Sequence, residues 1–186
     1  IFGYIFLSFF IYDIVDFKIQ EDSNYRIDSQ VEYEIDQNYG YYPKKNSSLE
    51  ERIYFKDKLI KTINYNINKF GHREISNNNS IKKCIIFHGG SFTFGQTLNN
   101  SETLPYYTKT ILMDNFNIYN YAFNGYGAHQ FLSKIENNYL DELAYCKDVI
   151  IVYQFISDHI ARSAGKRSWG DKSPRYILIN NHEIKQ

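Results

Sequence analysis

Several residue types that mark special classes of protein are scarce in this chain. Its 186 residues include 2 Cys, 3 Pro, 1 Met and 1 Trp. Two cysteines are too few for a disulfide framework, and no group of His, Cys, Asp and Glu has the spacing of zinc ligands. Cys84 lies in an apolar run, which predicts a small buried core residue because free cysteine is often buried. We therefore expect neither a disulfide framework nor a metal site.

An excess of charge of either sign is also absent. The chain carries 21 basic and 21 acidic residues, so its formal net charge is zero. Proteins that bind nucleic acids usually present a basic field. The balance gives no support for a nucleic-acid partner, and none is predicted. The hydrophobic content of 43% is sufficient for one domain with a proper core.

No apolar run is long enough to cross a membrane by itself. The longest, "IFGYIFLSFFIY" (1–12), has twelve residues without a charge, whereas a spanning helix needs about 20. One interpretation is that residues 1–17 are the remnant of a membrane anchor or signal segment. The alternative is a buried strand or helix. If the anchor interpretation holds, the protein is attached to a membrane through its N-terminus and faces the periplasm or the cell exterior.

Aromatic residues are abundant instead, at 18% of the chain. Residues 18–80 alternate loosely between polar and aromatic or aliphatic residues, which indicates a β-rich lead-in segment. Within it, "VEYEI" (31–35) predicts a short strand, and residues 52–68 predict one or two strands. The Gly, Pro, Asn and Ser of residues 38–48 mark a turn-rich loop.

From residue 81 onward, apolar strand-like runs alternate with helix-like segments. The predicted strands are 84–88, 116–123, 149–156 and 176–180, and the predicted helices lie within 101–115 and 127–146. The second helix places its apolar residues on one face: Phe131, Leu132, Ile135, Tyr139, Leu140 and Leu143. This alternation predicts an α/β fold whose parallel sheet is covered on both faces. Loops at the carboxyl ends of such strands are the usual ligand sites.

The first of these loops, "HGGSFTFG" (88–95), allows three interpretations. A phosphate loop is disfavoured because Gln96 stands where that motif requires lysine. A plain strand-to-helix turn would need the glycines only for its geometry, with Ser91 helping to cap the helix. The third interpretation makes Ser91 a nucleophile at the top of the sheet, where nearby backbone N–H groups could stabilise an oxyanion.

The other strand ends favour the nucleophile. A glycine-containing turn, "NYAFNGYGAHQ" (120–130), follows the second strand. The segment "QFISDHIAR" (154–162) follows the third and carries Ser157, Asp158 and His159. Since parallel strands end at one edge of the sheet, we expect these three turns to form a single site.

With these turns in view, the chain resembles the SGNH (GDSL-type) hydrolase superfamily, in particular its membrane-anchored bacterial members. "GGSFTFG" is similar to the first block, Gly-Asp-Ser-x-x-x-Gly, with Gly90 in place of Asp. "NYAFNGYG" resembles the second block, with Ala122 replacing its first glycine and Gly125 matching the second. "VIIVYQFISDHIAR" resembles the strand that leads into the third block. The resemblance covers residues 38–162.

The resemblance implies a flavodoxin-like three-layer α/β/α sandwich with a central parallel sheet, over residues 81–186. It also implies a serine esterase or O-acyl hydrolase that works through an acyl-serine without cofactors. Its substrate would be a small-molecule, lipid or glycan ester. An O-acyltransferase of the same fold, or a non-catalytic glycan-binding or assembly protein, remains the alternative.

The family pattern assigns roles to individual residues. Ser91 matches the nucleophile, and the N–H groups of Ser91 and Gly125 match two oxyanion donors. Ser157 stands where the family has an asparagine as the third donor, and a hydroxyl donates only one hydrogen bond. Residues expected to shape the site are Gly90, Asn124, Gln154, Asp158 and His159.

The catalytic base has no match to the family pattern in this chain. The family supplies a histidine and its carboxylate from a late Asp-x-x-His block, which does not occur after Arg162. The expectation is that this block lies in a further C-terminal portion. Asp158 and His159 are neighbours and, on an extended strand, would point to opposite sides. They are therefore expected to shape the site or to pair with Arg162, with catalysis by His159 as the alternative.

Overall fold

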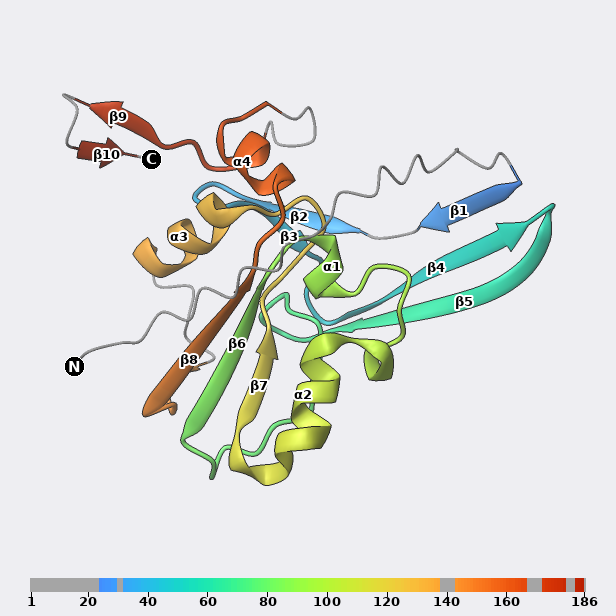
Figure 1. Cartoon of the computed structure of the whole chain (residues 1–186), viewed down its shortest axis with the longest axis horizontal. Helices are drawn as coiled ribbons and strands as arrows, with labels where there is room; N and C mark the ends of the chain where they lie inside the picture. The colour runs from blue at the N-terminus through green and yellow to red at the C-terminus, as the bar shows by residue number, and fades with distance from the viewer. Residues whose placement is uncertain (1–23, 30–31, 138–142, 167–171, 180–182, 186) are drawn as a thin grey trace.

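The computed structural model describes residues 24–29, 32–137, 143–166, 172–179 and 183–185. It has a mixed α/β architecture, in which a three-stranded parallel sheet follows several antiparallel strands (Figure 1). No helix among the described residues is long and apolar enough to span a membrane. The N-terminal apolar run, residues 1–17, lies outside the described residues.

The antiparallel strands come from the first part of the chain. They are β1 (Tyr25–Ser29), β2 (Tyr33–Asp36), β3 (Gly40–Pro43), β4 (Ser47–Phe55) and β5 (Lys58–Ile67). β2 pairs with β3, and β4 lies between β1 and β5. The long β4–β5 hairpin extends away from the body (Figure 1) and reverses at Lys56 and Asp57, which both adopt positive φ. Positive φ at both central residues is the geometry of a two-residue hairpin turn.

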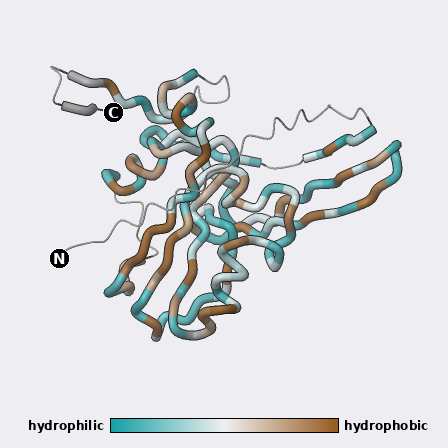
Figure 2. Tube along the Cα trace, viewed as in Figure 1, coloured by the Kyte–Doolittle hydropathy of each residue, from teal (hydrophilic) through white to brown (hydrophobic). Residues whose placement is uncertain are grey.

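The parallel sheet has the order β7-β6-β8. Its strands are β6 (Lys83–Gly89), β7 (Asn117–Asn120) and β8 (Asp148–Gln154). β6 is central and buried from Cys84 onward, as its continuous apolar sequence predicts. The apolar residues of β8, visible as a brown segment in Figure 2, are less covered: Ile150 and Ile151 are 49% and 48% exposed.

The fourth predicted strand does not join this sheet. β9 (Ile177–Ile179) pairs antiparallel with β10 (Glu183–Lys185) in a separate two-stranded sheet. The prediction of a fourth parallel strand was therefore wrong. Consecutive short strands usually pair with each other, and here the next extended segment follows after three residues.

The helices are few and short. They are α1 (Ser91–Phe94), α2 (Leu104–Leu112), α3 (Ala128–Glu136) and α4 (Asp158–Ser163), with 3-10 turns η1 (Asn100–Glu102) and η2 (Met113–Asn115). α2 lies against β7 (Figure 1). Its start is fixed by the Thr103 hydroxyl, which accepts a hydrogen bond from the Tyr106 N–H at 3.3 Å, and by Pro105 in the first turn.

The buried face of α3 differs from the prediction. Its apolar residues Leu132 and Ile135 are 39% and 43% exposed, while the polar residues His129, Gln130, Ser133 and Lys134 are buried. These polar groups have partners: the Ser133 hydroxyl donates to the Asn38 carbonyl. The Lys134 ammonium lies 5.1–5.3 Å from the ring centres of three tyrosines, Tyr39, Tyr121 and Tyr126. Tyr139 and Leu140, predicted on the same face, lie outside the described residues.

The two cysteines form a disulfide, which the sequence analysis did not expect. Cys84 is fully buried as predicted, but its sulfur is bonded to that of Cys146. Cys84 lies near the start of β6 and Cys146 lies just before β8. Since β6 and β8 are paired in parallel, their amino ends are neighbours. Proximity created by sheet pairing cannot be read from a separation of 62 residues.

Candidate functional site

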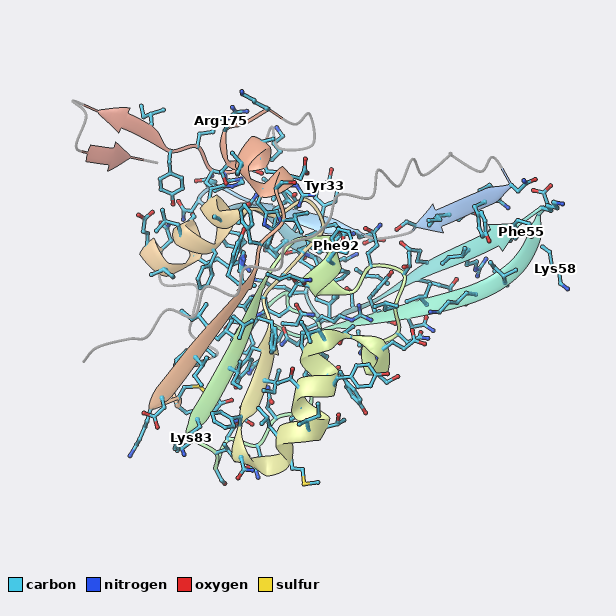
Figure 3. The ribbon with its side chains drawn as sticks, in the orientation of Figure 1. Tyr33, Phe55, Lys58, Lys83, Phe92 and Arg175 are labelled. Carbon is cyan, nitrogen blue, oxygen red and sulfur yellow. A yellow bond between two sulfur atoms is a disulfide. The ribbon has the colours of Figure 1, made fainter. Side chains whose placement is uncertain are left out.

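Ser91 lies at the junction between the central strand of the parallel sheet and a short helix. β6 ends at Gly89, Gly90 precedes α1, and Ser91 is the first residue of α1. Figure 3 shows Phe92 of this turn far from Lys83, at the opposite end of β6. Ser91 is half-buried, and its hydroxyl has no hydrogen-bond partner among the described residues.

The surroundings of Gly90 show which segments meet at this turn. A Cβ atom added to Gly90 would lie 2.6 Å from Arg162 Nη1, 3.1 Å from His159 Nε2 and 3.4 Å from the carbonyl oxygen of Tyr126. The turns after β6, β7 and β8 therefore lie together at the carboxyl edge of the sheet. A side chain at position 90 would force the guanidinium of Arg162 to move.

Arg162 joins two of these turns. Its Nη1 donates to the Tyr126 carbonyl at 2.9 Å, and its Nε donates to Asp158 Oδ2 at 2.7 Å. Both side chains of this ion pair are largely shielded from solvent. The expected pairing of Asp158 with Arg162 is thus observed. As a consequence, this carboxylate oxygen is already bound by a cation.

His159 lies beside Gly90 and is 2% exposed. Its Nδ1 is 2.7 Å from the Tyr153 hydroxyl, and its Nε2 is buried with no partner in the described part of the chain. Burial, and to a lesser extent the positive charge of Arg162, lowers the pKa of His159 to about 4, while Asp158 opposes the shift. The ring is therefore neutral at pH 7. In the tautomer with Nδ1 protonated, Nε2 is a free acceptor.

The prediction that His159 lies on an extended strand was wrong. β8 ends at Gln154, and Asp158 and His159 form the first turn of α4. In a helix, consecutive side chains are about 100° apart, so these two are not opposed. His159 and Arg162 are three residues apart and share one face of α4, so both can reach Gly90.

The remaining predicted site residues have different surroundings. Gly125 adopts φ +78° in the turn after β7, a conformation that favours glycine. The side-chain oxygen of Asn124 is buried without a partner among the described residues. Gln154 accepts a hydrogen bond from the Thr93 hydroxyl at 2.7 Å, which ties β8 to α1. Ser157 is exposed, and its hydroxyl makes no hydrogen bond within the described ranges.

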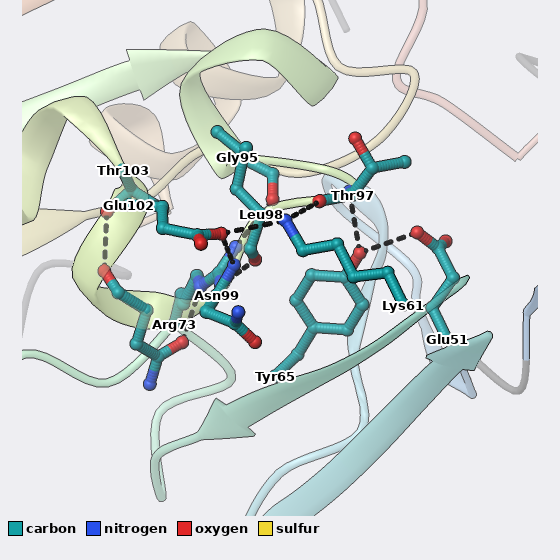
Figure 4. Close-up of polar contacts among 11 residues, drawn as sticks. Glu51, Lys61, Tyr65, Arg73, Gly95, Thr97, Leu98, Asn99, Glu102 and Thr103 are labelled. Carbon is teal, nitrogen blue, oxygen red and sulfur yellow. Dashed lines mark hydrogen bonds and ion pairs between the residues drawn. The ribbon is translucent and has the colours of Figure 1, made fainter. Parts of the chain in front are cut away.

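Arg73 holds the loop that follows Ser91, and the sequence did not predict this role. Its buried guanidinium donates to the carbonyls of Gly95 and Leu98 at 2.8 and 2.6 Å (Figure 4). It also donates to the Phe94 carbonyl at 2.8 Å and to Asn100 Oδ1 at 2.7 Å. Burial lowers the pKa of Arg73 to about 10. A single arginine in a loop carries no sequence signal for this role, because its four acceptors belong to residues 94–100.

A second network in Figure 4 fixes the same loop to the hairpin. The Lys61 ammonium binds the Thr97 carbonyl at 3.1 Å and Glu102 at 3.0 Å. The Tyr65 hydroxyl donates to Glu51 and accepts from the Thr97 N–H, each within 2.9 Å. The Ser91 turn and the loop that follows it are therefore held by the antiparallel strands as well as by the parallel sheet.

The chain matches no family model, no curated protein and no solved structure. Within the described ranges, no group of three or more His, Cys, Asp or Glu residues could hold a metal ion. The site is thus defined by its own geometry, which combines a half-buried serine, a neutral imidazole and a buried arginine.

Proposed function

We propose that this chain is a serine esterase or O-acyl hydrolase of the SGNH type, with Ser91 as the nucleophile. We also propose the complete fold of that family, a three-layer sandwich around the parallel sheet. The observation that supports both is the meeting of three turns at Gly90, where His159 Nε2 lies without a partner among the described residues. The substrate class is a small ester, a lipid ester or an O-acetylated glycan.

In the proposed reaction, Ser91 Oγ attacks the ester carbonyl carbon, and the ester C–O bond breaks to release an alcohol. An imidazole takes the serine proton and returns it to the leaving alcohol. A water molecule then attacks the acyl-serine, which releases the acid and restores the hydroxyl. The backbone N–H groups of Ser91 and Gly125 would stabilise the oxyanion, with Ser157 as the third donor.

His159 is the imidazole adjacent to the turn among the described residues. Tyr153 would orient it in place of the usual carboxylate, because Asp158 binds Arg162. A base with a pKa near 4 is a weak base at neutral pH, which limits the rate it can support.

The same features favour a rival function. An SGNH-like protein without catalysis, used for glycan binding or assembly, would need neither an oriented base nor a complete oxyanion hole. The ion pair of Asp158 with Arg162 and the exposed Ser157 are consistent with that rival. An O-acyltransferase would share the acyl-serine and pass the acyl group to an alcohol instead of water.

We propose that the protein works outside the cytoplasm. The Cys84–Cys146 disulfide supports this location, because structural disulfides form in oxidising compartments and are rare in the cytosol. Attachment through the N-terminal apolar run is part of the same proposal.

Hydrolysis of p-nitrophenyl acetate tests the proposed activity. Ser91→Ala should reduce kcat/KM by about 10³-fold or more, and His159→Gln by about 10²–10⁴-fold. Ser80→Ala, which removes a hydroxyl outside the site, should leave the rate unchanged. Equal rates for Ser91→Ala and the unmodified protein would reject the enzyme and favour the binding protein.

A further inference from the structure

A cavity of about 640 Å³ lies in a different part of the molecule and shares no residue with the Ser91 site. Residues 67–79 form much of its wall, and Tyr119 of β7 and Tyr145 complete it. Its volume is within the range of ligand pockets, roughly 300–1,000 Å³. The proposed reaction at Ser91 does not use it.

Tyr119 gives the cavity an unsatisfied polar group. The residue is 4% exposed, and its hydroxyl is buried with no partner among the described residues. Its ring is held in a cluster with Cys84 and Tyr121. A buried hydroxyl without a partner is costly, and a ligand hydroxyl that displaces the atoms covering it would satisfy it.

The chemistry of the lining matches a neutral ligand that carries many hydroxyls. Asn46 and Asn79 are exposed on the rim, and within the described ranges their side-chain amides make no hydrogen bond. Each amide can donate two hydrogen bonds and accept two, as a row of hydroxyls requires. Phe70 and Tyr145 add aromatic surface on which the apolar face of a sugar ring can pack.

The charges of the lining disfavour an anionic ligand. Lys69 and Glu74 are the charged residues in the lining of the large cavity, and their formal charges cancel. The smaller cavity beside it adds Lys109, whose ammonium donates to the Phe116 carbonyl at 3.2 Å. Sites for phosphate or nucleic acid concentrate positive charge instead. A neutral chain of sugars is therefore the better fit.

The shape favours a ligand longer than one sugar. A second cavity of about 270 Å³ shares Ile75 and Asn77 with the first. Asn77 is fixed between them, since its amide donates to the Ile118 carbonyl and accepts from the Ile118 N–H. We propose that the large cavity, continued by the smaller one, binds a segment of a neutral oligosaccharide and that the Tyr119 hydroxyl hydrogen-bonds to it.

Isothermal titration of the full chain tests this site with cellotetraose, maltotetraose and tetra-N-acetylchitotetraose. At least one of them should bind. Tyr119→Phe, which removes one oxygen, should weaken that binding about fivefold, the loss of one hydrogen bond, without lowering Tm. Tyr145→Ala should weaken it about tenfold or more, because it removes the aromatic surface on which a sugar ring packs. Ser91→Ala should bind as the unmodified protein does, so this result does not depend on the proposed enzyme activity.

Three outcomes would overturn the proposal. The first is that none of the three sugars binds at a sugar concentration of about 5 mM, which is above the Kd of even weak specific binding. The second is tighter binding of tetragalacturonate, or of a neutral tetra-alanine peptide with both ends blocked, than of the neutral sugars. The third is equal affinity of Tyr119→Phe and the unmodified protein.

Discussion

At the Ser91 site, hydrogen bonds connect one turn to another. At the rim of the Tyr119 cavity, in contrast, exposed side-chain amides make no hydrogen bonds within the described residues. Arg162 joins α4 to Tyr126, and Thr93 joins α1 to Gln154. The cavity has exposed Asn46 and Asn79 around a buried tyrosine. The first arrangement suits chemistry that requires fixed positions, and the second suits the binding of a ligand that brings its own hydrogen bonds.

The two regions are also held by different parts of the structure. Arg73 supports the loop that follows Ser91, while the Cys84–Cys146 disulfide lies in the cluster with Tyr119 and Tyr145. Removing each support should therefore damage one region more than the other.

Arg73→Ala should have the largest effect. It leaves three carbonyls and the Asn100 side chain without their charged donor, and hydrogen bonds to charged groups contribute about 1.5–3 kcal/mol each. We expect a loss of about 4–5 kcal/mol in the free energy of unfolding, measured by urea denaturation. Arg73→Lys keeps the positive charge but replaces the planar guanidinium, with its several N–H donors, by a single ammonium. If this variant folds, its Ser91 reactivity should fall more than its sugar binding. Equal losses in both regions would contradict their separation.

Removal of the disulfide should come next. The double variant Cys84→Ala, Cys146→Ala opens a loop closed over 62 residues and should lose about 3–4 kcal/mol of stability. Because Tyr119 and Tyr145 pack on this bridge, sugar binding should fall more than Ser91 reactivity. Thermal unfolding and titration of this variant, with dithiothreitol-treated protein for comparison, provide the check. Unchanged sugar binding together with lost Ser91 reactivity would show that the disulfide supports the Ser91 site and not the cavity.

Acid should weaken the fold by a smaller amount. Burial lowers the pKa of His129 and His159 from 6.5 to about 4, and it lowers the pKa of the buried His72 and His88 well below 6.5. The unfolded chain therefore binds protons more readily, so stability is full above about pH 6.5 and falls as the pH drops toward 4. After solvent screening we expect roughly 1–2 kcal/mol from each of His129 and His159. His129→Gln should flatten the dependence measured by urea denaturation from about pH 7.5 to about pH 4.5, and an unaltered slope would count against this cause.

The sequence predicted three of its four parallel strands correctly, and also the position of Ser91 after the first, because these features rest on local patterns. Buried strands such as β6 are apolar throughout, and a glycine pair marks the turn after them. It could not predict the Cys84–Cys146 bond, which depends on β6–β8 pairing, or the support from Arg73, whose acceptors are mostly backbone atoms. The buried polar face of α3 was missed for a related reason. Lys134 is buried because three tyrosines from separate elements surround it, which the helical pattern does not show.

Covalent labelling asks directly whether Ser91 is the nucleophile of the proposed esterase. A fluorophosphonate reacts with an activated serine by forming an Oγ–P bond and releasing fluoride. The full-length protein should gain one adduct, located on Ser91 by peptide mass spectrometry and absent from Ser91→Ala, while Ser80→Ala labels normally. If the folded chain gains no adduct at Ser91, this serine is not an activated nucleophile.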